Sequence, residues 1–228
     1  MALLLPLGMQ AQLKDLVDKA RGKVEKVTGG DEIGNGLKAA LQQGVEKQVA
    51  KLAAQDGFNK NEAVRILFPP ELQRVEQALR MAGLHQMADS GIRSMNRAAE
   101  EAVKEATPVF MDAIGKMTFA DARSILTGGE RAATSYLENT TAATLHQRFL
   151  PIVRKNFEQV GADKAWATLI NRYNQMPLVK KVNPDMNDYV TKKALDGVYL
   201  MIAREEKEIR TRVEARTTPL LRKVFAQQ

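Results

Sequence analysis

Apolar residues recur every three or four positions through most of the chain, the spacing that gathers them on one face of an α-helix. The plainest stripe lies between 37 and 52 and consists of Leu37, Leu41, Val45, Val49 and Leu52. Similar spacing over 84–107, 130–150 and 185–213 predicts the longest helices. No short stretch alternates β-branched and polar residues between turn signals, as a strand would. The pattern therefore predicts an all-α fold without a sheet.

Glycine, proline and capping residues divide the pattern into segments. We expect a turn at Asp56-Gly57, a short helix over 61–67, and a kink or a restart of the helix at Pro151. Thr118 followed three residues later by Asp121 resembles a capping box and predicts that a helix begins at the next residue after the threonine.

Shorter helices are expected near both ends, over 12–27 and 218–225, and 176–184 is expected to be a loop. No linker is long enough to suggest two domains, and the connections have the lengths usual for packed helices. The segments together predict a single bundle-like domain over 12–228 with roughly eight to ten helices.

The first eleven residues, MALLLPLGMQA, resemble the back half of a secretory signal peptide. An apolar run gives way to the small residue Ala11, and polar helical sequence begins at Gln12. The segment lacks a basic lead, and Met9 is a poor residue before a cleavage site. We therefore expect a signal peptide remnant over 1–11 and a periplasmic or otherwise exported protein, with a cytoplasmic N-terminus packed on the body as the alternative. The run is too short for a transmembrane segment.

The amino-acid composition excludes several kinds of binding site. The 228 residues are 44% hydrophobic but only 5% aromatic, which favours helix-on-helix packing. The absence of Cys removes disulfides and thiolate ligands. His85 and His146 are the only histidines, and neither has the Glu-x-x-His or His-x-x-x-His spacing of helical metal sites. We expect no metal site and no cofactor.

The formal charge of +7 is partly local. Basic residues outnumber acidic ones between 148 and 181, and Arg148, Arg154 and Lys155 are candidates for an anion-facing surface. A solvated helix face explains the same pattern. Aromatic residues are too sparse for a base-stacking platform, so no nucleic-acid partner is expected.

Six residues are candidates for a ligand site: Asn96, Arg97, Glu100, Asp112, Asp121 and Arg123. The first three share one predicted helix whose other side is apolar, and the spacing pairs Arg97 with Glu101 and Asn96 with Glu100. If this cluster turns inward, its polar groups need partners and could line a pocket or fix the register of the helices. The structural interpretation is favoured, because charge pairs on helices are common surface features.

Several longer motifs carry a resemblance to a known family. They include SMNRAAE at 94–100, FLPIV at 149–153, YVTKKALDG at 189–197 and ARTTPLLRKVF at 215–225. In these motifs the chain resembles, from about Ile33 to Phe225, the bacterial family known as domain of unknown function 4197. The resemblance implies a secreted, helical bacterial protein. It implies no activity, and no functional residue can be carried over from it.

Three functional hypotheses remain open. The first is a non-enzymatic envelope protein that binds an unknown envelope protein or a small ligand through its helical body. The second is a hydrolase or lyase that uses Glu100 with Asp112 or Asp121 as paired carboxylates. The third is a binder of anionic envelope polymer through the basic segment 148–181.

Overall fold

The computed structural model describes residues 33–159, 167, 168, 170, 171, 173–175, 181, 185–216 and 222. The regular structure of these residues is entirely helical, which confirms the all-α prediction. The signal-like segment 1–11 and the predicted helix 12–27 lie outside the described residues. So do the predicted loop 176–184, except Lys181, and the predicted helix 218–225, except Arg222.

Helical residues 33–53 come first and are followed by an irregular segment, 54–69. The later elements are η1 (Pro70–Leu72), α2 (Gln73–Met81), α3 (His85–Val103), α4 (Ala106–Lys116), α5 (Phe119–Thr127), α6 (Ala132–Gln159), α8 (Met186–Thr211) and η2 (Val213–Ala215). The described part of the chain thus holds seven α-helices, slightly fewer than the roughly eight to ten expected.

Segment 61–67 accounts for part of this difference. Residues 61–67 make a turn and then irregular backbone rather than a helix, because the Asn61 side chain accepts the Ala63 N–H and the Ile66 backbone is bonded to another helix. Of the two expectations at Pro151, a kink or a restart, the restart does not occur, because the residue lies inside the continuous helix α6. The missing proline N–H costs one helical hydrogen bond, but α6 continues because its flanking apolar residues are buried against α3 and α8.

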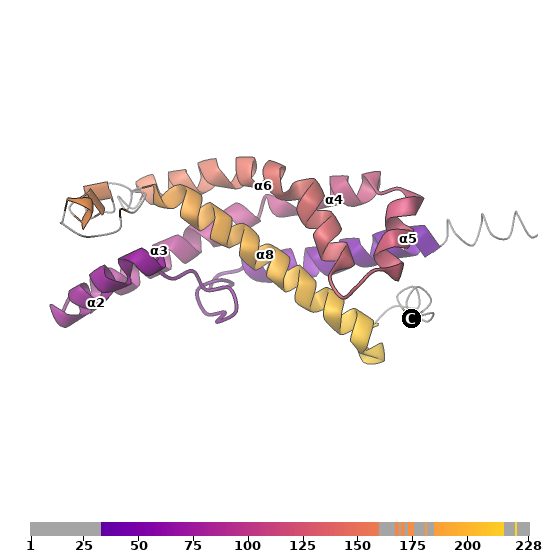
Figure 1. The fold of residues 1–228 in the computed structure, drawn as a ribbon, viewed down its shortest axis with the longest axis horizontal. Coiled ribbons are helices and arrows are strands. Elements are labelled where there is room, and N and C mark those ends of the chain that lie inside the picture. Colours follow the sequence, from indigo (N-terminus) through magenta and orange to yellow (C-terminus); the bar gives the residue numbers. More distant parts are fainter. Residues whose placement is uncertain are drawn as a thin grey trace, which may run out of the picture.

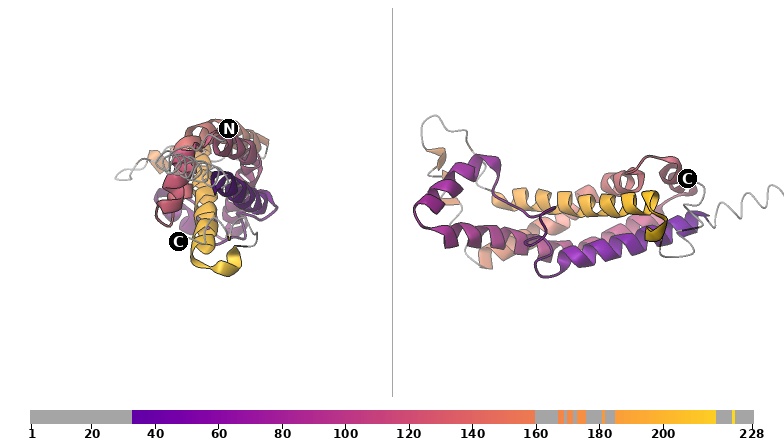
Figure 2. Two further views of the ribbon diagram at one scale, coloured as in Figure 1. Left: turned by 90° about the vertical axis from the view of Figure 1, so that its right-hand side faces the viewer. Right: turned by 90° about the horizontal axis from the view of Figure 1, so that it is seen from below.

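The helices form an elongated bundle in which α6 and α8 lie side by side and α3 packs against both (Figure 1). The main core lies between these three helices, and its largest fully buried side chains include Phe110, Phe149, Phe157 and Met95. The α2–α3 hairpin lies at one end of the bundle. The beginning of helix 33–53, α5 and the end of α8 gather at the other end (Figure 2).

A smaller apolar cluster lies at the α5 end and includes Leu37, Met117 and Ile125. The capping box predicted for α5 is confirmed: Thr118 Oγ1 accepts the Asp121 N–H at 3.1 Å, and Asp121 Oδ2 accepts the Thr118 N–H at 2.9 Å. The cap fixes where α5 begins and so holds it over the smaller cluster. None of the described helices is long and apolar enough to span a bilayer.

Candidate functional site

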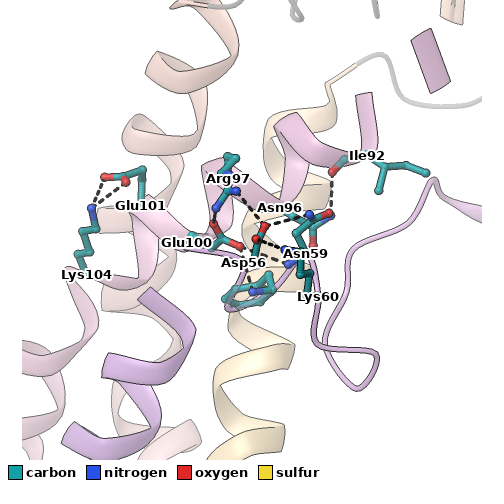
Figure 3. Close-up of polar contacts among 10 residues, drawn as sticks. Asp56, Asn59, Lys60, Ile92, Asn96, Arg97, Glu100, Glu101 and Lys104 are labelled. Carbon is teal, nitrogen blue, oxygen red and sulfur yellow. Dashed lines mark hydrogen bonds and ion pairs between the residues drawn. The ribbon is translucent and has the colours of Figure 1, made fainter. Parts of the chain in front are cut away.

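Asn96 on α3 points into the protein and is completely buried. Its Oδ1 accepts the Ile66 N–H at 2.9 Å, and its Nδ2 donates to the Ile66 carbonyl at 2.8 Å. The Nδ2 also donates to the Ile92 carbonyl at 2.7 Å (Figure 3). The amide therefore pairs with one residue of segment 54–69 in the way that a neighbouring strand would. All of its donors and its acceptor atom are engaged, which is what a buried amide requires.

Glu100 lies one turn further along α3 and is 2% exposed. Its Oε1 accepts the N–H groups of Phe58 and Asn59 at 3.1 and 3.2 Å. Its Oε2 accepts from Arg97 Nη1 at 2.6 Å. Arg97 thus pairs with Glu100 rather than with Glu101, the pairing expected from the spacing, because Glu100 is the inward carboxylate and Glu101 lies outside with Lys104 (Figure 3).

Arg97 also reaches segment 54–69 directly, since its Nη2 donates to Asp56 Oδ1 at 2.8 Å. Asp56 accepts a further bond from Asn59 and pairs with Lys60 at 2.9 Å. The hydrogen bond from Lys60, followed by that from Asn59, lowers the pKa of Asp56 below its usual 3.8. The predicted turn is confirmed here: Asp56 has a φ of 66°, and a Cβ on Gly57 would lie 2.4 Å from the Lys51 carbonyl.

Helix α8 holds the same segment from the other side. A Cβ on Gly197 would lie 2.7 Å from the Phe58 ring, so only glycine allows this close approach. Tyr189 donates its hydroxyl to the Leu67 carbonyl at 2.9 Å, and burial raises the pKa of that phenol. The inward polar cluster of α3 and these α8 contacts together anchor 54–69, which is the register-fixing interpretation of the cluster.

The other three ligand candidates do not join this cluster. Asp112 is exposed on α4 and pairs with Lys116 at 2.7 Å. Asp121 caps α5, and its hydrogen bonds from Thr118 lower its pKa. Arg123 is exposed on α5. Since the candidate carboxylates have separate partners on separate helices, the paired-carboxylate hypothesis gains no support from the geometry.

A groove between α4 and α6 brings together two of the residues singled out from sequence, Asp112 and Arg148. Its volume is about 380 Å³, within the range of ligand pockets. The remaining lining residues are Pro108, Val109, Ala113, Lys116, Tyr136, Thr140, Thr141 and Thr144. The groove therefore presents two cations, one carboxylate and several hydroxyls over an apolar floor.

The three candidates for an anion-facing surface are all exposed on α6. Arg148 opens onto the groove, and its 3.7 Å contact with Glu105 is too long for a hydrogen bond. Arg154 and Lys155 lie further along the helix and do not line the groove. Of the three candidates, only Arg148 lines the groove.

Sequence reasoning missed the second buried acid, Glu206 on α8, which is 7% exposed. Its Oε1 accepts the Ala133 N–H at 2.9 Å, and its Oε2 accepts the Thr134 N–H at 2.8 Å and the Thr134 hydroxyl at 2.7 Å. Arg210 donates to it and also to the Ile125 carbonyl. The only local signal is an i, i+4 Glu–Arg pair, which α8 repeats at Glu208 and Arg212 on its surface.

Within the described ranges, no group of three or more His, Cys, Asp or Glu residues is placed to hold a metal ion. His146 instead makes a single 2.8 Å contact with Asp188 across α6 and α8. Hydrogen bonds from Lys192 and then from His146 lower the pKa of Asp188. The pair therefore links α6 to α8.

Comparison with known proteins gives one match. The sequence model of the family described as "Protein of unknown function (DUF4197)" matches residues 28–226. No curated protein and no solved structure matches the chain. The family match covers most of the sequence, and the chain belongs to this family.

Proposed function

We propose that this member of the DUF4197 family is a non-enzymatic binding protein that holds a small anionic, hydroxyl-bearing ligand in the groove between α4 and α6. The observation that carries the proposal is the convergence of Arg148, Lys116 and threonine hydroxyls on one groove of about 380 Å³. The ligand would be a small molecule such as a sugar phosphate, with its anionic group at the two cations.

Arg148 is the cation best prepared to receive an anion. Its guanidinium is half exposed, and its pairing with Glu105 at 3.7 Å is loose. Exposed pairs of this kind contribute about 0–1 kcal/mol, so exchanging Glu105 for a ligand costs little. A guanidinium that donates two parallel bonds to a phosphate or carboxylate gains more, because both partners are charged.

The rest of the groove favours a ligand that also carries hydroxyl groups. Asp112 and Lys116 are more than half exposed, so their ion pair can open to accept and donate bonds to a ligand. Thr140 uses its hydroxyl hydrogen on the Tyr136 carbonyl and keeps its oxygen lone pairs as acceptors. Val109 and Ala113 provide an apolar surface beneath these groups.

A binding role is favoured over catalysis by the state of the buried acids. Glu100 and Glu206 each accept at least three hydrogen bonds from the protein, which leaves neither placed to exchange a proton with a ligand in the groove. Asp112 alone provides a carboxylate to the groove lining. General acid–base hydrolysis by paired carboxylates would need a second one beside it.

The proposal includes a location in the cell envelope, supported by the signal-like sequence of residues 1–11. N-terminal sequencing of the protein isolated from cells tests this part separately. A start near Gln12 supports export, whereas an intact start at Met1 or Ala2 contradicts it. The proposal of ligand binding in the groove does not depend on where the mature protein begins.

The binding test uses glucose 6-phosphate, glucose and inorganic phosphate as probes, with amide chemical shifts as the measurement. We expect glucose 6-phosphate to shift the signals of Thr140 and Thr144 at lower concentration than either fragment. Arg148→Gln should weaken its binding by about tenfold or more, since one charge-assisted interaction is lost. Arg154→Gln, an exposed arginine of the same helix outside the groove, is the matched control and should leave the affinity unchanged.

Two results would contradict the proposal. If none of the three probes shifts signals at the groove, a small anionic, hydroxyl-bearing ligand is excluded. Equal weakening by the two arginine variants, together with steep salt dependence, would favour the anionic-polymer hypothesis for the basic face of α6.

A further inference from the structure

A second hollow, separate from the groove between α4 and α6, lies at the α5 end of the bundle. It is walled by helix 33–53 and α8, and its apolar lining includes Leu37, Leu41, Val45, Ile125, Ile202 and Ile209. The volume within it is only about 30 Å³, close to the share of a single water molecule in the liquid. Such a shallow apolar hollow does not fit a small-molecule ligand, but it fits side chains presented by a covering element.

Two exposed apolar residues that do not line the hollow lie at the same end of the bundle. Phe119 at the start of α5 is 51% exposed, and a Cβ on Gly34 would lie 3.7 Å from its ring. Val213 in η2 is 61% exposed. Large apolar side chains left in water beside an apolar hollow are typical of a surface that another element covers.

The chain itself turns back toward this hollow after α8. Arg216 Nε donates to the Ile209 carbonyl at 3.0 Å, and its Nη2 donates to the Arg210 carbonyl at 3.1 Å. Both acceptors belong to residues that line the hollow. Arg216 is therefore held beside the hollow, at the end of the bundle where α8, α5 and the start of helix 33–53 meet (Figure 2).

We propose that the C-terminal segment, residues 217–228, docks on this hollow as a short amphipathic helix. Its apolar residues are Leu220, Leu221, Val224 and Phe225, a spacing that places all four on one helical face. The eight residues of the expected helix 218–225 extend about 12 Å, which matches the roughly 12 Å from Leu37 to Val45 along the opposing helix. No linker is needed to bring the two together.

Two further observations support this occupant. Arg222, the one residue of the segment that the structure describes, is helical and exposed, and its Nε donates to the Arg216 carbonyl at 3.1 Å. That bond ties Arg222 to Arg216, close to the end of α8. The family match continues to residue 226 and so includes most of this segment.

The absence of cysteine allows a clean test in the full chain. A nitroxide attached through Ala226→Cys should broaden the amide signals of Leu41 and Gly44 in the oxidised state and release them on reduction. Gly83, in the α2–α3 hairpin at the opposite end, should be unaffected (Figure 1). Adding Leu221→Asp to the labelled chain should abolish the broadening, because a carboxylate cannot enter the apolar hollow.

Lys223→Asp introduces the same carboxylate on the polar face and should leave the broadening intact, which controls for charge. Broadening of neither Leu41 nor Gly44 overturns the proposal. Broadening that appears only between labelled and unlabelled molecules in a mixed sample would make a second copy the occupant and overturn it as well. So would broadening from a nitroxide at Ala11→Cys in place of the C-terminal label, since the occupant would then be the N-terminal segment.

Discussion

Glu100 on α3 and Glu206 on α8 are both buried carboxylates, and each accepts two backbone N–H groups and pairs with an arginine of its own helix. Their surroundings differ. The N–H groups bonded to Glu206 belong to the first turn of α6, whereas those bonded to Glu100 belong to the irregular segment 54–69. The side chain of Arg210 is 7% exposed, and that of Arg97 is 38% exposed.

The two buried carboxylates therefore have different structural roles. Glu206 provides the negative charge that favours the N-terminus of a long helix, and its partner Arg210 ties α8 to α5 through the Ile125 carbonyl. Glu100 and Asn96 instead replace the backbone partners that segment 54–69 lacks, so their effect is local. We therefore expect damage at Glu206 to reach the whole fold and damage at α3 to stay within the segment.

The largest effect is expected from Arg210→Met. The variant leaves Glu206 charged and buried without its cation, a change that costs about 3–5 kcal/mol where a buried pair is broken. Urea unfolding measures it as a lower midpoint with an unchanged slope. Arg212→Met, at the residue that follows α8, removes an exposed partner of Glu208 and should cost about 0–1 kcal/mol. Equal losses in the two variants would contradict the special role of Arg210.

A smaller and local effect is expected from Asn96→Leu, which keeps the side-chain size but removes the partners of the Ile66 N–H and carbonyl. Because the segment can open locally and return these groups to water, we expect a cost of about 1–3 kcal/mol. Amide hydrogen exchange should accelerate at Ile66 and Phe58 while the amides of α6 and α8 exchange as before. Acceleration spread evenly over α6 would show that the segment and the bundle unfold together. That result would contradict a purely local role for Asn96.

The smallest effect concerns pH at the edge of the α3 cluster. The pKa of Asp56 is lowered in the folded protein, so its stabilising contribution is present above about pH 3.8 and is lost as the pH falls toward the folded value. Asp56→Asn keeps a residue that tolerates positive φ but removes the charge. We expect the variant to be slightly less stable than the parent at pH 6, and we expect this difference to shrink as the pH falls below about 3.8, by urea unfolding.

Glu101→Gln is the control for this pH effect, because Glu101 pairs with Lys104 on the outer side of α3 and does not touch segment 54–69. Its exchange rates across 58–66 should match those of the parent at both pH values. An Asp56→Asn deficit that persists unchanged at low pH would rule out titration of Asp56 as the cause.

The binary pattern was sufficient to predict the helices, because apolar periodicity and capping are local in sequence. The stripe at Leu37–Leu52 is a helix with a buried face, and the cap at Thr118 begins α5 as expected. The prediction was wrong at 61–67, and the helix does not restart at Pro151. In both places contacts distant in sequence, with Asn96 and with the packed faces of α3 and α8, outweighed the local signal.

The same contrast between local signals and distant contacts applies to the candidate site. The sequence indicated that Asn96, Arg97 and Glu100 were a possible inward cluster, because polar residues shared a helix with an apolar face. Their partners lie 30 to 42 residues away, and no local spacing could identify them. Glu206 was missed because its pair with Arg210 has the same spacing as the exposed pair Glu208–Arg212.

The sequence by itself determined that this protein is helical, where most of its helices begin and end, and which face of each is apolar. Only the tertiary structure decided which polar residues became buried anchors and which lined an open groove. The physical reason is that helix formation and amphipathicity depend on neighbours within a few residues, whereas the burial of a charge depends on which distant helix covers it.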